Sequence, residues 1–245
     1  MSAVRATRQG AILLLELNAP ERRNALSRPM LARLAEHLRE PAEGVLGVVL
    51  AGRGGTFSAG ADFREISGTV DDLGYDDAVT AAREAIQSSP LPVVAAIEGP
   101  CMGAAADLAL ACDFRVAAEG GFVAIPAAGL GLLYNPDVVV RLARTFDADV
   151  LRRLLLLGQR LSAEEALRRG LVTEVVPAGS AARRAAELLG GLSAGSAPAV
   201  AATKALLNAC TGGPPAAEHW QALRRDLLGS PERRHAVERA RDRHA

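Results

Sequence analysis

Short aliphatic runs that alternate with helical segments constrain the fold of this chain more than any other feature. Four of them read as buried strands: Ala11–Leu17, Val45–Leu50, Val93–Ile97 and Phe114–Ala117. A helix is predicted to begin at Ser27, and others cover 78–87 and 104–111. Strands that alternate with helices favour a mostly parallel sheet with right-handed crossovers, so the pattern predicts an α/β fold.

The sequence pattern changes after about Pro136, beyond which apolar residues at helical spacing dominate. Helices are predicted at Asp137–Thr145, Asp149–Leu157, Ala163–Gly170, Ser180–Leu189, Pro198–Ala209 and Pro215–Leu228, with one strand at Leu171–Val176. A stretch rich in glycine and serine near 190–197 reads as a hinge. We therefore expect an α/β core over 1–195 and a C-terminal helical region over 196–245.

Composition excludes several classes of function. The 245 residues carry 28 Lys and Arg against 28 Asp and Glu, which argues against a surface for nucleic acid or anionic membranes. The N-terminus has no signal-peptide core, and no apolar run reaches the roughly 18 residues of a membrane span. A cytoplasmic protein is expected, with its three cysteines as buried free thiols.

Common cofactor and nucleophile motifs are absent from the sequence. It contains no GxGxxG after a strand, no GxxxxGK[ST] and no GxSxG elbow. The four histidines fall on predicted helix surfaces with a spacing that fits no metal site. Nucleotide cofactors, metals and a serine nucleophile are therefore unsupported.

Two glycine-rich loops remain, each at the carboxyl end of a predicted strand, where open α/β sheets present ligand sites. The first contains Phe57–Phe63, and the second runs from Gly99 into the helix that begins at Ala104. Small residues let a ligand approach the backbone, and a helix N-terminus offers unpaired N–H groups. Two such N–H groups from separate loops would stabilise an oxyanion. Each loop taken alone also reads as an ordinary tight turn.

Four blocks together resemble the enoyl-CoA hydratase/isomerase (crotonase) superfamily: ERRNAL at 21–26, FSAGADF at 57–63, IEGPCMGAAADLALACD at 97–113 and GQRLSAEEALRRGLVTEVVP at 158–177. The resemblance covers roughly residues 10–210. It implies a core spiral of ββα units, trimers stacked into hexamers, and a C-terminal region that covers the site or a neighbouring subunit. The substrate implied is an acyl-coenzyme A thioester, with no separate cofactor.

The resemblance also assigns the backbone of the site. The N–H of Ala61 is the first oxyanion donor and the N–H of Ala104 the second, where many relatives have glycine. Arg23 and Ala25 should lie along the phosphates and pantetheine of coenzyme A, and the backbone of Ala59, Asp62 and Phe63 should cradle the adenine. Guanidinium suits phosphate, although Arg23 also reads as a solvated loop residue. Lys204 reads as a surface lysine more than as a nucleotide contact.

Asp107 is the first candidate for proton transfer. It lies three residues after Ala104 in an almost wholly apolar helix. Burial would raise its pKa, as a catalytic acid or base requires. The alternative is an aspartate that hydrogen-bonds a neighbouring loop. By the resemblance, hydratases carry glutamate here and some isomerases carry aspartate.

The second catalytic glutamate of the hydratases has no counterpart, because Ala127 occupies its place. Losing one general acid or base typically costs about 10²–10⁴-fold in rate. Asp137 could substitute, but Asn135 and Pro136 before it favour a helix cap with a first-turn acid. Tyr134 could line the acyl pocket or donate a proton, and Met102, Gly103 and Ala127 complete the expected contacts to the substrate.

Three functions follow from these residues. Double-bond isomerisation needs a single base, here Asp107, and fits better than hydration by two glutamates. A non-catalytic acyl-CoA binding or carrier protein is the alternative, since it would keep the oxyanion hole and lose the second glutamate. A thioester hydrolase or dehalogenase-like enzyme would need Asp137 as its nucleophile.

Overall fold

A six-stranded sheet forms the centre of the computed structural model, which describes residues 2–191, 196–211 and 217–242. Its strands follow the order β1-β2-β3-β4-β6-β9: Val4–Gln9, Ile12–Leu17, Gly47–Gly52, Val93–Ile97, Phe114–Ala118 and Glu174–Val176. Only the β1–β2 pair is antiparallel. The predicted α/β fold with a mostly parallel sheet is confirmed.

A second, three-stranded sheet lies beside the first and carries the second glycine-rich loop. Its strands are β5 (Pro100–Met102), β7 (Phe122–Ala124) and β8 (Leu161–Ser162), with β7 in the middle. β5 pairs parallel with β7, and the Gly103 N–H donates to Ala124 O at 2.8 Å. This sheet therefore fixes the chain immediately before the helix that begins at Ala104.

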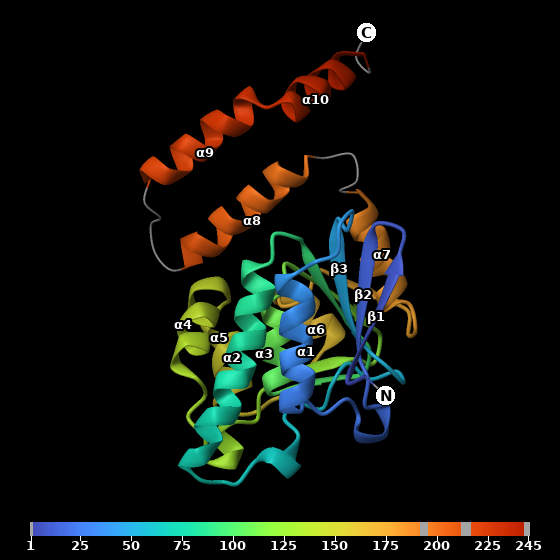
Figure 1. Cartoon of the computed structure of the whole chain (residues 1–245). Coiled ribbons are helices and arrows are strands. Elements are labelled where there is room, and N and C mark those ends of the chain that lie inside the picture. Colours follow the sequence, from blue (N-terminus) through green and yellow to red (C-terminus); the bar gives the residue numbers. More distant parts are fainter. Residues whose placement is uncertain (1, 192–195, 212–216, 243–245) are drawn as a thin grey trace.

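Helices cover both faces of the central sheet because alternate strand residues point to opposite sides. On one face, Val48, Leu50 and Val93 pack with α1 (Arg28–Arg39), α2 (Leu73–Ser88) and α3 (Ala104–Ala111). On the other face, Val49 and Val94 pack with α7 (Ala181–Gly190). Figure 1 shows α1 and α2 side by side along the first face.

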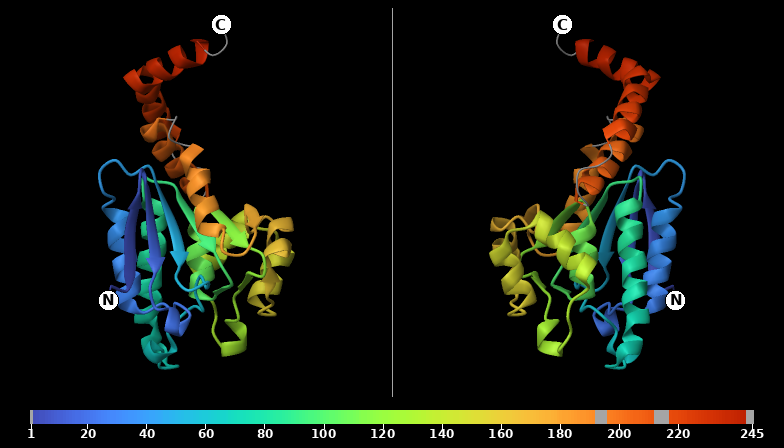
Figure 2. Two further views of the ribbon diagram at one scale, coloured as in Figure 1. Left: turned by 90° about the vertical axis from the view of Figure 1, so that its right-hand side faces the viewer. Right: turned by 90° about the vertical axis from the view of Figure 1, so that its left-hand side faces the viewer.

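The helices after β7 and those at the C-terminus differ in how they contact the core. α4 (Pro136–Thr145), α5 (Ala148–Leu155) and α6 (Ala163–Arg168) pack against it, and α8 (Ala197–Thr211) contacts α2 and α4. In contrast, α9 (Ala217–Gly229) and α10 (Pro231–Asp242) extend away from it (Figures 1 and 2). The division at 195 and the covering role stay predictions, and 192–195 of the expected hinge lie outside the described residues.

Lys204 corrects one expectation. We expected a surface lysine, but its side chain is only 6% exposed and joins α8 to the core. Its Nζ donates to the Ile86 and Leu91 carbonyls at 3.0 and 2.8 Å and lies 2.9 Å from Asp113 Oδ2. The expectation of three buried cysteines is wrong for Cys210, which is exposed, and confirmed for Cys101 and Cys112. All three are free thiols.

Candidate functional site

The loop after β3 is held by buried side-chain hydrogen bonds. The Asn24 amide donates to the carbonyls of Arg53 and Thr56, and the Ser58 hydroxyl donates to Asn24 O at 2.7 Å. Ser58 Oγ in turn accepts the Gly60 N–H at 3.1 Å. These bonds satisfy polar groups that lie inside the protein, so the loop has one defined shape.

The two glycine-rich loops are joined directly to each other. Ser58 N–H donates to Pro100 O at 3.0 Å, and Met102 N–H donates to Ser58 O at 3.2 Å. Gly60 has φ +93°, and a Cβ placed there would lie 2.7 Å from Met102 O. Glycine at this position therefore permits both the left-handed conformation and the close approach of the loops.

Ala61 and Ala104, the expected oxyanion donors, lie on either side of this junction. Leu26 donates to Gly60 O and accepts from Asp62 N–H, so the chain is fixed on both sides of Ala61. Ala104 is the first residue of α3, after Gly103 with φ +53° and ψ −121°. Within the described part of the chain, neither the Ala61 nor the Ala104 N–H donates to a protein acceptor. The amides of two half-buried residues, on loops that are hydrogen-bonded to each other, thus have no protein acceptor among the described residues.

Asp107 lies one turn after Ala104 on α3, and its side chain is only 3% exposed. Arg141 from α4 donates to its Oδ1 at 2.6 Å, while Arg83 Nε from α2 lies 3.5 Å from its Oδ2. Burial raises the pKa of Asp107, and the charges of Arg141 and Arg83 oppose that rise. The carboxylate is therefore buried, oriented by arginine, and shifted towards the protonated form.

The two arginines around Asp107 were not anticipated from the sequence. Arg83 and Arg141 lie on amphipathic helices, where a charged residue normally faces water. Arg141 also donates to Leu110 O at 2.9 Å, and Arg83 lies within 3.5 Å of the Thr80 hydroxyl. The available signal was the cost of an unpaired carboxylate in an apolar helix, which demands a cation from elsewhere in the fold.

Tyr134 lies just before α4 and contacts the residue that precedes α3. Its hydroxyl donates to Gly103 O at 3.1 Å, immediately before the Ala104 amide. Burial, followed by the negative charge of Asp107, holds the pKa of Tyr134 well above its ordinary value. The phenol therefore stays protonated and acts as a hydrogen-bond donor.

Asp137 occupies the first turn of α4 and is exposed. Its N–H donates to Asn135 Oδ1 at 3.0 Å, and Asn135 also accepts from Val138 N–H. The Asn135 amide donates to Asp76 Oδ2 at 2.5 Å. This is the geometry of a helix N-cap followed by a first-turn acid.

Ala127 is buried and begins the turn Ala128–Leu130 after β7. Its carbonyl accepts hydrogen bonds from Leu130 and Leu132 N–H. By the family resemblance, hydratases carry their second glutamate at this position, where this chain has only a methyl group. Met102 and Gly103 are half-buried at the loop junction.

Residues expected at the coenzyme A end surround the first loop. Arg23 is exposed, and its carbonyl accepts from Ala59 N–H at 2.9 Å. Asp62 is buried, and its carboxylate binds the Arg64 side chain at 2.9 and 2.6 Å, which holds its pKa below the ordinary value. Its N–H donates to Leu26 O at 3.1 Å and its carbonyl accepts from Glu65 N–H at 2.9 Å, so only the second lone pair of that carbonyl is left for a ligand. Phe63 is 64% exposed, and Ala25 is half-buried.

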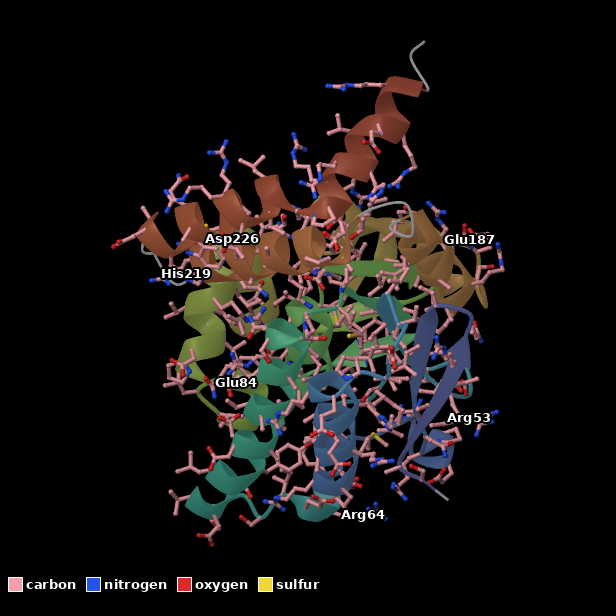
Figure 3. The ribbon with its side chains drawn as sticks, turned by 45° about the horizontal axis from the view of Figure 1, so that its top comes forward. Arg53, Arg64, Glu84, Glu187, His219 and Asp226 are labelled. Carbon is pink, nitrogen blue, oxygen red and sulfur yellow. The ribbon has the colours of Figure 1, made fainter. Side chains whose placement is uncertain are left out.

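Figure 3 places this end of the molecule away from the C-terminal helices. Arg53 and Arg64 point outward on the side of the core opposite to α9, which carries His219 and Asp226. No group of three or more His, Cys, Asp or Glu among the described residues could hold a metal ion. Over the same residues, no helix is long and apolar enough to cross a membrane.

Known proteins resemble this chain over most of its length. The family model described as enoyl-CoA hydratase/isomerase matches residues 7–244. A probable enoyl-CoA hydratase of Mycobacterium bovis is 36% identical over 183 residues, 74% of each chain. The 2,3-dehydroadipyl-CoA hydratase of Escherichia coli is 32% identical over 179 residues, 72% of this chain and 70% of the relative.

Solved structures give the same likeness. An enoyl-CoA hydratase/carnithine racemase from Magnetospirillum magneticum has a TM-score of 0.91 at 27% identity, covering 99% of this chain and 94% of its own. An enoyl-CoA hydratase from Polaromonas sp. JS666 has a TM-score of 0.80 at 32% identity, covering 91% and 89%.

Proposed function

The chain belongs to the enoyl-CoA hydratase/isomerase family and is an enzyme of that family, and from this premise we propose that it isomerises the double bond of an enoyl-CoA thioester. The N–H groups of Ala61 and Ala104 bind the thioester oxygen and stabilise the enolate that forms when a proton leaves the neighbouring carbon. Asp107 takes that proton and returns it to another carbon of the same acyl chain.

One observation carries the proposal: two backbone amides on joined loops have no protein acceptor. Buried N–H groups are nearly always hydrogen-bonded in proteins, to protein or to water, and those without a protein acceptor call for an explanation. A thioester oxygen bound between Ala61 and Ala104 supplies that explanation for both amides at once. Donors that are already in place before the reaction need no reorganisation as negative charge develops.

The environment of Asp107 supports its role as the proton carrier. Its raised pKa brings the carboxyl group closer to the range in which it can both accept and release a proton. The 2.6 Å bond to Arg141 orients the carboxylate through one oxygen, while Arg83 Nε forms no hydrogen bond at the other. Ala127 offers no second titratable group, which favours isomerisation over hydration.

The substrate contacts and the assembly are also part of the proposal. Arg23 and Ala25 lie along the phosphates and pantetheine, and the backbone of Ala59, Asp62 and Phe63 holds the adenine. Met102, Gly103, Ala127 and Tyr134 border the thioester and acyl group. The relative from E. coli is named for a CoA thioester, which supports this substrate class. We further propose a trimer or a dimer of trimers, in which α9 and α10 cover the site or a neighbouring subunit.

Turnover by an Asp107→Asn variant tests the proposal. We expect 3-enoyl-CoA isomerisation to fall by about 10²–10⁴-fold while acyl-CoA binding persists, because only the proton carrier is lost. Asp113→Asn is the matched control, since Asp113 is ion-paired with Lys204 away from the two loops. It should lose stability without losing activity per folded molecule.

The outcomes separate the candidate functions. Wild-type turnover in Asp107→Asn would contradict the role of Asp107. Crotonyl-CoA hydration faster than 3-enoyl-CoA isomerisation would contradict the preferred reaction. Acyl-CoA binding with no turnover of either substrate, unaffected by the substitution, would favour the carrier alternative, and failure to bind acyl-CoA would contradict the oxyanion hole.

A further inference from the structure

The two donor amides differ in what holds the other end of their peptide groups. The Gly60–Ala61 peptide accepts a hydrogen bond at its carbonyl from Leu26 N–H, at 2.8 Å. The Gly103–Ala104 peptide accepts from Asp107 N–H at 3.2 Å and also from the Tyr134 hydroxyl at 3.1 Å. The first peptide is thus fixed by main chain alone, whereas the second depends in part on a side chain.

A hydrogen bond to a peptide carbonyl strengthens the N–H of the same peptide. The bond draws electron density towards the oxygen, which makes the amide hydrogen more positive. In the low dielectric of a buried site this polarisation is not screened by water. Tyr134 and the thioester oxygen would therefore sit at opposite ends of one polarised peptide group.

Tyr134 is suited to this task because it stays a donor. Its pKa is raised by burial and by the charge of Asp107, so the phenol keeps its proton. The residue directly precedes Asn135, whose capping bonds fix the start of α4. With its single proton directed at Gly103 O, the hydroxyl cannot at the same time donate to an acyl group.

We propose that Tyr134 is a positioning residue that orients the Gly103–Ala104 peptide and strengthens the Ala104 N–H as an oxyanion donor. This inference rests on the proposed oxyanion hole, but not on turnover. It assigns Tyr134 a role through the backbone, in addition to lining the acyl pocket and in place of the proton donation considered from the sequence.

Acetoacetyl-CoA provides a test that needs no reaction at a double bond. Its enolate absorbs in the ultraviolet, so the ratio of enolate to keto form on the protein reports stabilisation of the oxyanion. We expect wild type to raise this ratio above its value in water at the same pH. Cooperative strengthening of about 10–30% per bond, applied to an oxyanion donor, predicts that Tyr134→Phe lowers the bound ratio about two- to eightfold.

The chain offers a matched control because it contains only two tyrosines, Tyr75 and Tyr134. The Tyr75 hydroxyl is also buried and donates to a backbone carbonyl, that of Leu26, at 2.6 Å. That carbonyl belongs to neither donor peptide; it also accepts the Asp62 N–H beside Ala61, and this main-chain bond remains when the phenol is removed. Tyr75→Phe should therefore lose a similar buried hydrogen bond and keep the enolate ratio of wild type. Affinity for free coenzyme A should stay within about twofold of wild type in both variants, because uniform binding is not altered.

A second experiment strengthens the hydrogen bond from Tyr134 to Gly103 O, and it applies even if Tyr134→Phe does not fold. Tyr75→Phe protein made with 3-fluorotyrosine carries the more acidic phenol at position 134 alone, and its enolate ratio should rise. An unchanged ratio in Tyr134→Phe, or in the fluorinated protein, would overturn the inference and leave the oxyanion hole standing. A wild-type ratio no higher than in water would overturn the oxyanion hole and the inference together.

Discussion

Replacing Arg141 with methionine should destabilise the protein far more than replacing Arg83 with methionine. Both arginines face Asp107, but Arg141 makes a 2.6 Å charge-assisted hydrogen bond, whereas Arg83 Nε lies 3.5 Å away and has no hydrogen-bond partner. Removing the partner of a buried charge costs about 3–5 kcal/mol of unfolding free energy, which we expect for Arg141→Met. For Arg83→Met we expect about 1–2 kcal/mol, because Asp107 keeps Arg141 and the desolvation of Arg83 is relieved.

The pH dependence of the unfolding free energy shows whether the unpaired charge of Asp107 causes the loss of stability in Arg141→Met. The pKa of Asp107 is already raised by burial, and losing Arg141 raises it further. A raised carboxyl pKa means that the folded state binds the proton more tightly than the unfolded state. Stability is then greatest below the unfolded pKa and falls as pH rises through the folded pKa. The deficit of Arg141→Met should therefore be smaller at about pH 5 than at about pH 7.

Urea unfolding followed by circular dichroism, at one fixed protein concentration, measures these differences. The double variant Asp107→Asn/Arg141→Met should recover about 1–3 kcal/mol relative to Arg141→Met, because the unpaired carboxylate is gone. Arg153→Met is the surface control. Its pair with Asp149 is exposed and should contribute about 0–1 kcal/mol. A deficit that is equal at both pH values and is not relieved by Asp107→Asn would refute the electrostatic explanation.

Two further predictions test the loops and the cap. Gly60→Ala should lower the free energy of unfolding by more than about 1 kcal/mol and weaken enolate stabilisation, because φ is +93° and the new Cβ would lie 2.7 Å from Met102 O. Gly55→Ala is the control, since Gly55 also has a positive φ but lies in open space. Equal effects of the two substitutions on the bound enolate of acetoacetyl-CoA would contradict the role of the loop junction. Asn135→Ala should lower the free energy of unfolding by about 0.5–2 kcal/mol, and Asp137→Ala should lower it by about 0.3–1 kcal/mol. Asp137→Ala should keep its isomerase activity per folded molecule. Loss of that activity would make Asp137 a catalytic candidate again.

The sequence predicted correctly those strands and helices whose apolar residues are regularly spaced and buried. The strand Val93–Ile97 and the helix Ala104–Ala111 have the expected bounds, and Ser27 caps α1 by accepting from Met30 N–H. β1 was missed because only Val4 of its six residues is buried, so no apolar run marks it. β5 was missed because three residues beginning with proline carry too little pattern to read as a strand.

In the candidate site, too, features with a local sequence pattern could be predicted, and features formed by long-range contacts could not. Glycine marked both loops. Gly60 is required by its positive φ and by the close approach to Met102 O, and Gly103 by its positive φ alone. The partners of Asp107 could not be found in this way. Arg141 lies 34 positions away along the chain, and its contact with Asp107 exists only after α3 and α4 pack together. A long-range ion pair leaves no local pattern, so the sequence indicates only that some cation is needed.

The two sides of the site differ in how readily substitution can alter them. Main-chain hydrogen bonds to Leu26 fix the peptides around Ala61, so most side-chain changes there leave the donor in place. The Ala104 side depends on the length of the acid at Asp107, which lies on α3 itself, and on Tyr134 and Arg141, which come from α4 and the residues just before it. Differences in activity between this enzyme and its relatives should therefore arise mainly around α3, with the first loop acting as a constant half of the site.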